Sequence, residues 1–206
     1  MKALGIAFSA RKEGNCLKCV EYCLDKFKQY GFETEIINAF ELEIKPCSHC
    51  DYECCANKKC PIQDNVPEIY EKCEKATALI FAIPTYGGHL SSLYFAFRER
   101  APVPSPKTFA EYREKILRKI NFIIIGNIGA GGEMAVHEAL YNLENLNLPN
   151  LDFWPETLLL SAREYDRLSF NGDLIEVPEV RKRLDTFVEM ILKNVEKRRS
   201  ASPNMT

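Results

Sequence analysis

The sequence predicts an α/β fold: a doubly wound parallel sheet with helices on both faces. Two patterns indicate it, because short, continuously apolar runs recur along the chain and segments with helical apolar spacing separate them. Uninterrupted apolar runs are typical of parallel strands, which are buried on both faces. The length of 206 residues suits one domain of this kind. We find no internal repeat or linker, so we expect one domain over residues 1–199 and a short tail over residues 200–206.

Strands and helices are expected to alternate along the chain. The apolar runs predict strands at residues 3–8, 32–38, 78–83 and 120–125, and a fifth within 151–160. The apolar stripes predict helices at residues 15–30, 67–75, 91–100, 133–147 and from 178 onward. Pro84 is expected to end the third strand, Pro155 to mark an edge strand or a bulge, and Asn171-Gly172 to form a hairpin turn. This alternation is typical of a doubly wound sheet.

Residues 9–15, between the first strand and the first helix, offer a cradle for an anion. In a doubly wound sheet, ligands bind outside the carboxyl ends of the strands, where a helix N-terminus presents free backbone N–H groups. Ser9 supplies a hydroxyl, Arg11 a guanidinium and Asn15 a side-chain amide. Gly14 permits close approach. The alternative is a solvated turn in which Asn15 caps the helix.

Two glycine-rich loops follow the third and fourth strands. Residues 84–89 place Tyr86 between a proline and two glycines, and residues 126–132 contain four glycines. Glycine lets a backbone lie close to a flat ring and offer its amides to the ring edge. The alternative for residues 126–132 is a flexible connection. Together with the anion cradle, these loops suit a ligand with a phosphate at one end and a planar ring at the other.

The chain has nine cysteines, and five of them lie within fourteen residues. We expect no export signal and a cytoplasmic location, where clustered thiols bind metals or act in redox chemistry. The four ligands of an iron–sulfur cluster can come from this segment: Cys47, Cys50, either Cys54 or Cys55, and Cys60. Zinc is the alternative metal, with His49 able to replace one thiolate. A loop of free thiols is the third interpretation.

Composition narrows the class of partner. The formal net charge is −2 and the basic residues cluster only at residues 197–199, so we expect no nucleic-acid partner. No apolar stretch approaches the roughly 20 residues that cross a bilayer, so we expect no membrane partner. Cys16, Cys19 and Cys23 share one face of the first helix and are expected to fill the core. A second thiol site is conceivable if this helix start and the cysteine-rich loop share one edge of the sheet.

Four segments resemble motifs of the NADPH-dependent FMN reductase-like flavodoxins and of their iron–sulfur flavoprotein branch. Residues 5–15 resemble the G-x-x-x-S-x-R-x-x-G-N phosphate loop, and residues 83–88 resemble the s-P-x-Y-x-g isoalloxazine loop. Residues 131–133 resemble the G-G-[QE] of the third loop. Residues 47–60 resemble the compact cysteine motif of the iron–sulfur branch, although the spacing differs. The order of these motifs along the chain makes the resemblance specific.

The resemblance implies a flavodoxin-like five-stranded fold that binds FMN non-covalently, with residues 45–65 as a cysteine-rich insertion after the second strand. It implies FMN contacts by Ser9, Arg11, Gly14, Asn15, Cys16, Pro84, Thr85, Tyr86, Gly87, Gly88, Asn127, Gly131, Gly132 and Glu133. It implies a metal centre held by Cys47, Cys50, Cys54 and Cys60, with Cys54 preferred to Cys55 because relatives more often have a cysteine there. Cys16 stands where many relatives have Ser or Thr. Arg98 and Arg100 are expected to pair with acids or to line an interface near FMN.

The sequence therefore predicts an FMN-dependent oxidoreductase in which FMN is the reaction centre and no side chain acts as a nucleophile. Electrons are expected to pass between ferredoxin or NAD(P)H and a small acceptor, through FMN and a 4Fe-4S cluster. The resemblance also implies a homodimer or homotetramer. One alternative is an NAD(P)H-dependent FMN or quinone reductase whose cysteine loop is structural, with zinc or without metal. The other is a non-enzymatic electron carrier or redox sensor.

Overall fold

Five parallel strands form the central sheet, in the order β2-β1-β3-β5-β6. They are β1 (Lys2–Ala7), β2 (Glu33–Asn38), β3 (Ala78–Tyr86), β5 (Ile120–Ile125) and β6 (Thr157–Leu160). The short β4 (His89–Leu90) pairs antiparallel with the end of β3. The computed structural model describes residues 1–48, 50–51, 53–57, 60–101, 106–126, 131–144 and 155–201. The predicted five-stranded parallel sheet is confirmed.

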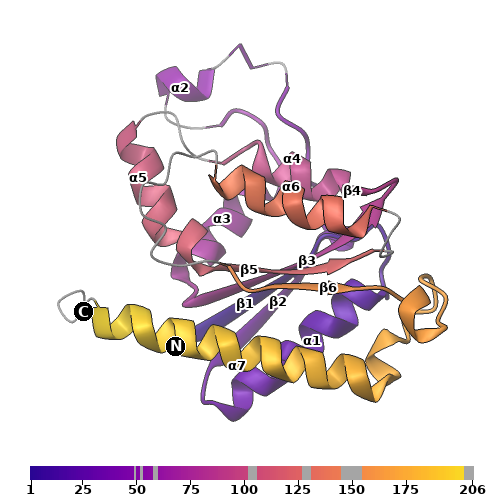
Figure 1. The fold of residues 1–206 in the computed structure, drawn as a ribbon. Helices are drawn as coiled ribbons and strands as arrows, with labels where there is room; N and C mark the ends of the chain where they lie inside the picture. Colours follow the sequence, from indigo (N-terminus) through magenta and orange to yellow (C-terminus); the bar gives the residue numbers. More distant parts are fainter. Residues whose placement is uncertain are drawn as a thin grey trace.

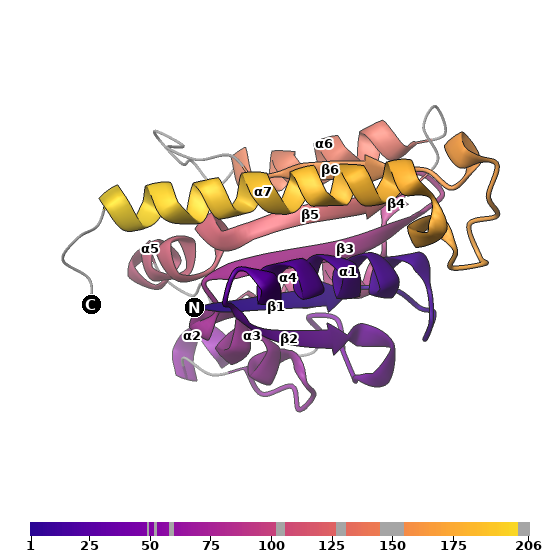
Figure 2. The same ribbon diagram turned by 90° about the horizontal axis from the view of Figure 1, so that it is seen from below.

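Helices cover both faces of this sheet, so it is doubly wound as predicted (Figures 1 and 2). On one face lie α1 (Asn15–Gln29) and α7 (Pro178–Ala201). On the other lie α3 (Val66–Lys75), α4 (Ser92–Arg98), α5 (Pro106–Lys115) and α6 (Gly132–Glu144), with the short α2 (Glu53–Asn57) beyond them. The buried side chains accordingly form two apolar layers, one on each face.

The strand order creates a crevice at the carboxyl ends of β1 and β3. From β1 the chain crosses to β2 on one side, and later to β3 on the other side. Doubly wound sheets bind ligands where the winding direction reverses in this way. β1 ends at Ala7, which pairs with Ala82, and β3 continues beyond it to Tyr86. The first and second candidate loops therefore start from neighbouring strands.

Glycine in the middle of β1 lets α1 pack directly on the sheet. A Cβ atom at Gly5 would lie 2.2 Å from Val20 Cγ1 and 3.2 Å from Leu24 Cδ1, both on α1. Side chains alternate along β1, so Leu4 and Ile6 enter the opposite layer, beneath α3 and α4. The first turn of α1, which belongs to the first candidate loop, is thereby fixed close to the end of β1.

Aromatic rings anchor α4 to the other face. Phe8, Phe81 and Tyr94 meet edge-on, with ring centroids 5.4 to 6.4 Å apart. The Tyr70 ring stacks on Phe97 at 4.4 Å, and its hydroxyl donates to the Phe97 carbonyl oxygen at 3.0 Å. Such pairs add about 0.5–1.5 kcal/mol beyond the area they bury. They hold α4, which links the second loop to the cysteine-rich segment, in one position.

Three local predictions were wrong. Pro84 does not end β3. The neighbouring strand β1 has already stopped at Ala7, so at Pro84 only β5 pairs with β3, and the missing N–H of proline is tolerated there as on an edge strand. Asn171-Gly172 forms no hairpin turn, because no strands flank it; Asn171 instead closes a turn in the connection from β6 to α7, where its N–H donates to the Leu168 carbonyl oxygen at 3.1 Å. The final helix continues to Ala201, two residues past residue 199, where the domain was expected to end. The helices α2 and α5 and the strand β4 were not predicted.

Candidate functional site

The first candidate loop runs from Phe8 to Asn15, where α1 begins. Ser9 is buried, and its Oγ accepts a hydrogen bond from the Arg11 backbone N–H at 3.2 Å. A Cβ atom at Gly14 would lie 3.4 Å from Arg11 Cβ and 3.7 Å from Ser9 Oγ, so glycine keeps the space between them open. The N–H groups in the first turn of a helix have no partner within the helix. The loop thus combines a cation, a hydroxyl and a helix N-terminus, which together attract anions.

A pocket of about 190 Å³ joins the first loop to the second. It is lined by Ser9, Arg11, Gly14, Asn15, Cys16, Pro84, Thr85, Tyr86, Ile125 and Ser169. The structure therefore brings together the five predicted residues of the first loop and three of the second. Tyr86 remains 46% exposed, so its ring is available to a ligand.

Glycines bring the third loop into contact with the second. A Cβ atom at Gly131 would lie only 2.3 Å from Gly88 Cα, and Gly131 has a positive φ of 99°. A Cβ atom at Gly126 would lie 2.5 Å from Thr85 Oγ1. These close approaches exclude other residues at Gly131 and Gly126, and they place the two loops side by side. The other predicted residues here are Gly132 and Glu133, which begin α6, and Asn127, which lies outside the described residues.

The hairpin that carries the second loop is also tied to α6. Gly87 and Gly88 make its turn, with positive φ angles of 59° and 86°. Just after the turn, the Leu90 backbone N–H donates to Glu138 Oε2 at 3.0 Å. Because α6 begins in the third loop, this bond fixes the second and third loops relative to each other. Sequence reasoning did not single out Glu138.

The connection from β6 to α7 supplies a wall of the pocket that sequence reasoning missed. Arg11 Nη1 donates to the Ser169 carbonyl oxygen at 2.7 Å, and Asn15 Nδ2 donates to the same oxygen at 3.3 Å. Asn15 Oδ1 accepts from the Leu174 N–H at 3.1 Å. Two of the predicted anion donors thus converge on one oxygen atom. No sequence signal could have revealed this wall, because every residue carries a carbonyl oxygen.

The cysteines of α1 belong to the core. Cys16, Cys19 and Cys23 are buried in the layer between the sheet and α7. Burial raises the pKa of all three thiols, that of Cys19 to about 12, so they are neutral near pH 7. Cys73, also buried, lies in the opposite layer. The described part of the cysteine-rich segment, with α2, lies on that opposite face too, so among the described residues α1 and this segment share no thiol site (Figure 1).

Four candidate ligands of the cysteine-rich segment are at least partly accessible to solvent. Cys47 is exposed, and Cys50, Cys54 and Cys60 are half-buried. Burial raises the pKa of Cys47, and the neighbouring Cys50, Glu99 and Cys60 raise it further, so these groups share one neighbourhood. Among the described residues, no three Cys, His, Asp or Glu side chains converge closely enough to hold a metal ion. His49 and the side chain of Cys55 lie outside the described residues.

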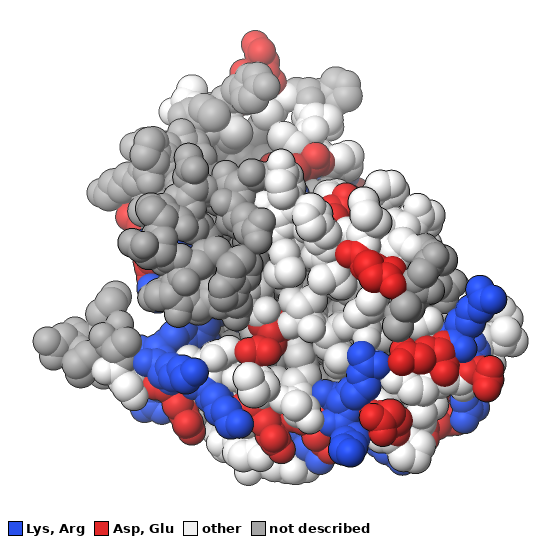
Figure 3. Space-filling model, in the orientation of Figure 1, with Lys and Arg blue, Asp and Glu red and all other residues white. Residues whose placement is uncertain are grey.

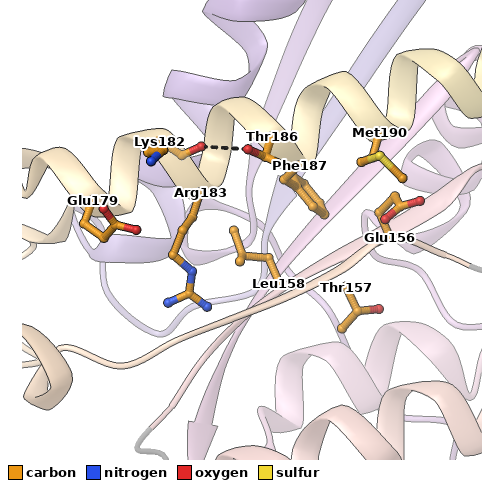
Figure 4. Close-up of a pocket in the computed structure, with 9 residues that line it drawn as sticks. All are labelled: Glu156, Thr157, Leu158, Glu179, Lys182, Arg183, Thr186, Phe187 and Met190. Atoms are coloured by element: carbon orange, nitrogen blue, oxygen red, sulfur yellow. Dashed lines mark hydrogen bonds between the residues drawn. The ribbon is translucent and has the colours of Figure 1, made fainter.

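A larger hollow, of about 370 Å³, lies where α7 crosses the edge strand β6 (Figure 4). Its lining mixes the acids Glu156 and Glu179 with the bases Lys182 and Arg183. Arg183 Nη2 donates to the Leu159 carbonyl oxygen at 2.7 Å, so the arginine satisfies an acceptor of the edge strand. Acids and bases also alternate along the face that carries α7 (Figure 3). The hollow contains none of the predicted site residues.

The geometry of the three loops agrees with a comparison of the sequence with protein families. The family model described as NADPH-dependent FMN reductase matches residues 1–152. The chain belongs to this family. The match includes the three candidate loops and the cysteine-rich segment.

Two relatives show the similarity of the sequence in detail. The chain is 36% identical over 110 residues to a protein named iron-sulfur flavoprotein from Methanosarcina thermophila, which is 53% of this chain and 57% of that relative. It is 27% identical over 201 residues to an iron-sulfur flavoprotein from Archaeoglobus fulgidus, which is 92% of this chain and 97% of that relative. In the first matches, such as that with the Methanosarcina protein, the chain spans about half the length of the relative.

The fold also matches solved structures. A crystal structure of RosB with bound 8-demethyl-8-formylriboflavin-5'-phosphate aligns with a TM-score of 0.61 and 18% sequence identity, over 100% of this chain and 88% of that one. The fold is flavodoxin-like, as the resemblance in the sequence implied. In the described part of the chain, every helix is too short or too polar to cross a bilayer.

Proposed function

We propose that this protein is an FMN-dependent oxidoreductase that passes electrons between a donor and a small-molecule acceptor. The observation that carries the proposal is the pocket of about 190 Å³ that joins the first and second loops at the carboxyl ends of β1 and β3. Membership of the NADPH-dependent FMN reductase family supports FMN as the ligand. The RosB structure, which shares the fold, holds a flavin phosphate.

The first loop fits the phosphate of FMN. Arg11 contributes a positive charge, Ser9 a hydroxyl, and α1 the positive end of its dipole. Arg11 and Asn15 already donate to the Ser169 carbonyl oxygen, at 2.7 and 3.3 Å. A phosphate oxygen is an acceptor of the same kind with a full negative charge, so the same donors suit it. The buried Cys16 thiol is only a weak donor there.

The second and third loops fit the flat ring of FMN. Pro84 and Thr85 line the pocket, and the exposed Tyr86 extends this wall. The close approach of Gly88 and Gly131 leaves no room for a side chain at position 131. When bound, FMN supplies the redox chemistry, and the chain binds the cofactor and orients it.

We propose further that Cys47, Cys50, Cys54 and Cys60 hold a 4Fe-4S cluster. Cysteine sulfur is the donor type that such a cluster needs. Cys50 and Cys60 both help to raise the pKa of Cys47, which supports a common neighbourhood for these three ligands. The relatives named iron-sulfur flavoprotein support iron over zinc. When bound, the cluster supplies one-electron steps between FMN and a carrier.

The proposal also covers the electron donor, the oligomeric state and the cellular location of the protein. A carrier such as ferredoxin, or NAD(P)H, delivers the electrons, and the working form is a homodimer or homotetramer. Exposed Tyr86, Leu168 and Phe170 support assembly, because large apolar side chains on a surface favour contact with another chain. Among the described residues, seven cysteines are free thiols, which supports a reducing, cytoplasmic location: Cys16, Cys19, Cys23, Cys47, Cys50, Cys60 and Cys73.

The test is anaerobic purification followed by a visible spectrum and by analysis of iron, sulfide, zinc and released flavin. We expect stoichiometric FMN together with iron and sulfide in equal amounts. Stoichiometric FAD, or the absence of flavin, would contradict the FMN proposal. Turnover of an acceptor with NADPH or with reduced ferredoxin separates an enzyme from a passive electron carrier.

One observation favours a second candidate, an NAD(P)H-dependent reductase whose cysteine loop is structural. Among the described residues, no three candidate ligands converge as a metal site. Zinc in place of iron, or FMN without metal, would establish this candidate in the same analysis. The pocket and its residues keep their role in both cases.

A further inference from the structure

Two adjacent residues at the end of α4 hold both ends of the cysteine-rich segment. Glu99 Oε1 accepts a hydrogen bond from the Cys47 backbone N–H at 2.6 Å. Arg100 Nη2 donates to Cys60 Sγ at 3.4 Å, which is within the longer reach of a hydrogen bond to sulfur. The first and the last predicted ligands of the metal centre are thus attached to two adjacent residues that directly follow α4.

The Arg100 guanidinium group is buried at the centre of these contacts. Its side chain is 1% exposed, and the side chain of Asp64, its ion-pair partner, is 0% exposed. Nη1 donates to Asp64 and, at 3.1 Å, to the Lys45 carbonyl oxygen. Nη2 donates to the Ile62 carbonyl oxygen at 3.3 Å as well as to Cys60. A buried arginine of this kind requires its partners, because an unpaired buried charge is costly.

We infer that Arg100 is a positioning residue for the metal centre and that its contact with the Cys60 sulfur raises the reduction potential of that centre. This inference rests on the proposed function, in which Cys60 ligates an iron–sulfur cluster. Arg100 holds the sulfur in place by a hydrogen bond and sets a permanent positive charge beside it. If Arg100 only anchored the cysteine-rich segment, its hydrogen bonds to the Lys45 and Ile62 carbonyl oxygens would suffice, and no bond to sulfur would be needed.

The sign of the effect follows from charge. A reduced cluster carries one more negative charge than an oxidised one, and hydrogen bonds to its sulfur atoms are among the factors that set its potential. Arg100 stabilises the more negative form and therefore raises the potential. Asp64 acts in the opposite direction, because its carboxylate lies behind the same guanidinium group. Replacing Arg100 and replacing Asp64 should consequently shift the potential in opposite directions.

The experiment measures iron content and midpoint potential in the full chain, purified without oxygen. Three variants are compared with wild type: Arg100→Gln, Asp64→Asn, and Arg98→Gln as the control. Arg98 is the last residue of α4, two positions before Arg100, so its replacement removes the same charge without removing the contact with Cys60. An EPR-monitored redox titration gives the potential, and a chelator challenge gives the rate of iron loss.

We expect Arg100→Gln to lower the midpoint potential and to speed iron loss to the chelator. Asp64→Asn should raise the potential, and Arg98→Gln should shift it less than Arg100→Gln. If Arg100→Gln keeps no cluster, Arg100→Lys takes its place, because it keeps the charge and loses the planar fork. Its potential should lie below that of wild type.

The outcomes separate this inference from the proposed function. Wild-type protein without iron and sulfide would overturn both. A wild-type cluster whose potential shifts in the same direction in Arg100→Gln and Asp64→Asn would overturn the inference alone, since lost anchoring explains that result. If Arg100→Gln has the same midpoint potential as wild type, the inference alone is overturned as well.

Discussion

Asn15 is a residue at which the fold and the ligand site depend on one side chain. The sequence indicates either a helix cap or a donor to an anion at this position. In the structure its Nδ2 donates to the Ser169 carbonyl oxygen, and its Oδ1 accepts from the Leu174 N–H. Replacing Asn15 would therefore disturb stability as well as binding. Ser9 is the better probe of the proposed phosphate site, because its hydroxyl contacts only its own loop among the bonds described.

Ser9→Ala is expected to weaken FMN binding by about 1.5–3 kcal/mol, the usual loss for a hydrogen bond to a charged group. The reason is that the buried hydroxyl lines the pocket beside Arg11. Titration of apoprotein with FMN, followed by flavin fluorescence, measures the dissociation constant. Ser169→Ala is the matched control, because residue 169 contributes its backbone carbonyl oxygen and affinity should persist. Equal affinity in wild type and Ser9→Ala would place the phosphate elsewhere.

Gly131→Ala is expected to separate the second and third loops and to lower FMN affinity. The new Cβ atom would lie 2.3 Å from the Gly88 Cα atom, and backbone cannot yield as a side-chain end can. Gly31→Ala is the control, since φ is also positive there but no described heavy atom lies within 4 Å of the new Cβ atom. Flavin titration compares the two variants. A Gly131→Ala protein that binds FMN as tightly as Gly31→Ala would contradict the proposed contact of these loops with the ring.

At the scale of elements, α1 and α4 decide where the site lies. α1 follows the first loop and packs on β1 through Gly5. α4 runs from the second loop to the cysteine-rich segment, and its seven residues span about 10 Å. The aromatic contacts of Tyr94 and Phe97 fix α4 on the sheet. The proposed flavin and metal sites are therefore connected by one short, well-packed helix.

Gly5→Ala is expected to lower the free energy of unfolding by about 1–3 kcal/mol, the usual cost of overpacking a core. Its Cβ atom would lie 2.2 Å from Val20 Cγ1, which belongs to α1. Adding Val20→Ala removes the clashing methyl group and should restore part of the loss. Urea unfolding of the two single variants and the double variant completes the cycle. Strictly additive effects would show that the two positions do not compete for space.

At the scale of the whole molecule, the two faces of the sheet carry different cysteines. Cys16, Cys19 and Cys23 fill the layer between the sheet and α7, whereas Cys73 lies in the other layer. Burial raises the pKa of each of these thiols, that of Cys19 and of Cys73 to about 12. The native state thus keeps these four thiols protonated in alkaline solution.

The stability of the metal-free protein is expected to fall as the pH rises above 9, the usual pKa of these thiols. Above that pH the unfolded chain releases thiol protons that the native state retains. Deprotonation therefore stabilises the unfolded state increasingly, and the free energy of unfolding falls. Cys19→Ala should make the decline less steep. Urea unfolding from pH 7 to 10.5 tests this, with the half-buried Cys50→Ser as control. A steeper decline in Cys19→Ala than in Cys50→Ser would contradict the role of burial.

Much of the fold and part of the site could be predicted from the sequence. The predicted limits of the strands β1, β2 and β5 differ by at most one residue from the observed ones. Residues of the first loop and Tyr86, which the sequence indicated, line one pocket, and their contact with FMN stays a prediction. The continuation of β3 through Pro84 was not predictable, because it depends on where the neighbouring strand β1 stops.

The sequence by itself determined the alternation of strands and helices, the positions of the three loops and the cysteine-rich segment. These features depend on local composition, which a chain carries whether folded or not. Only the tertiary structure decided that Ser169 closes the pocket, that the α1 cysteines face away from the cysteine-rich segment, and that Arg100 contacts Cys60. The physical reason is that each of these contacts joins groups distant in sequence. Their partners are set by how the sheet and its helices pack in space.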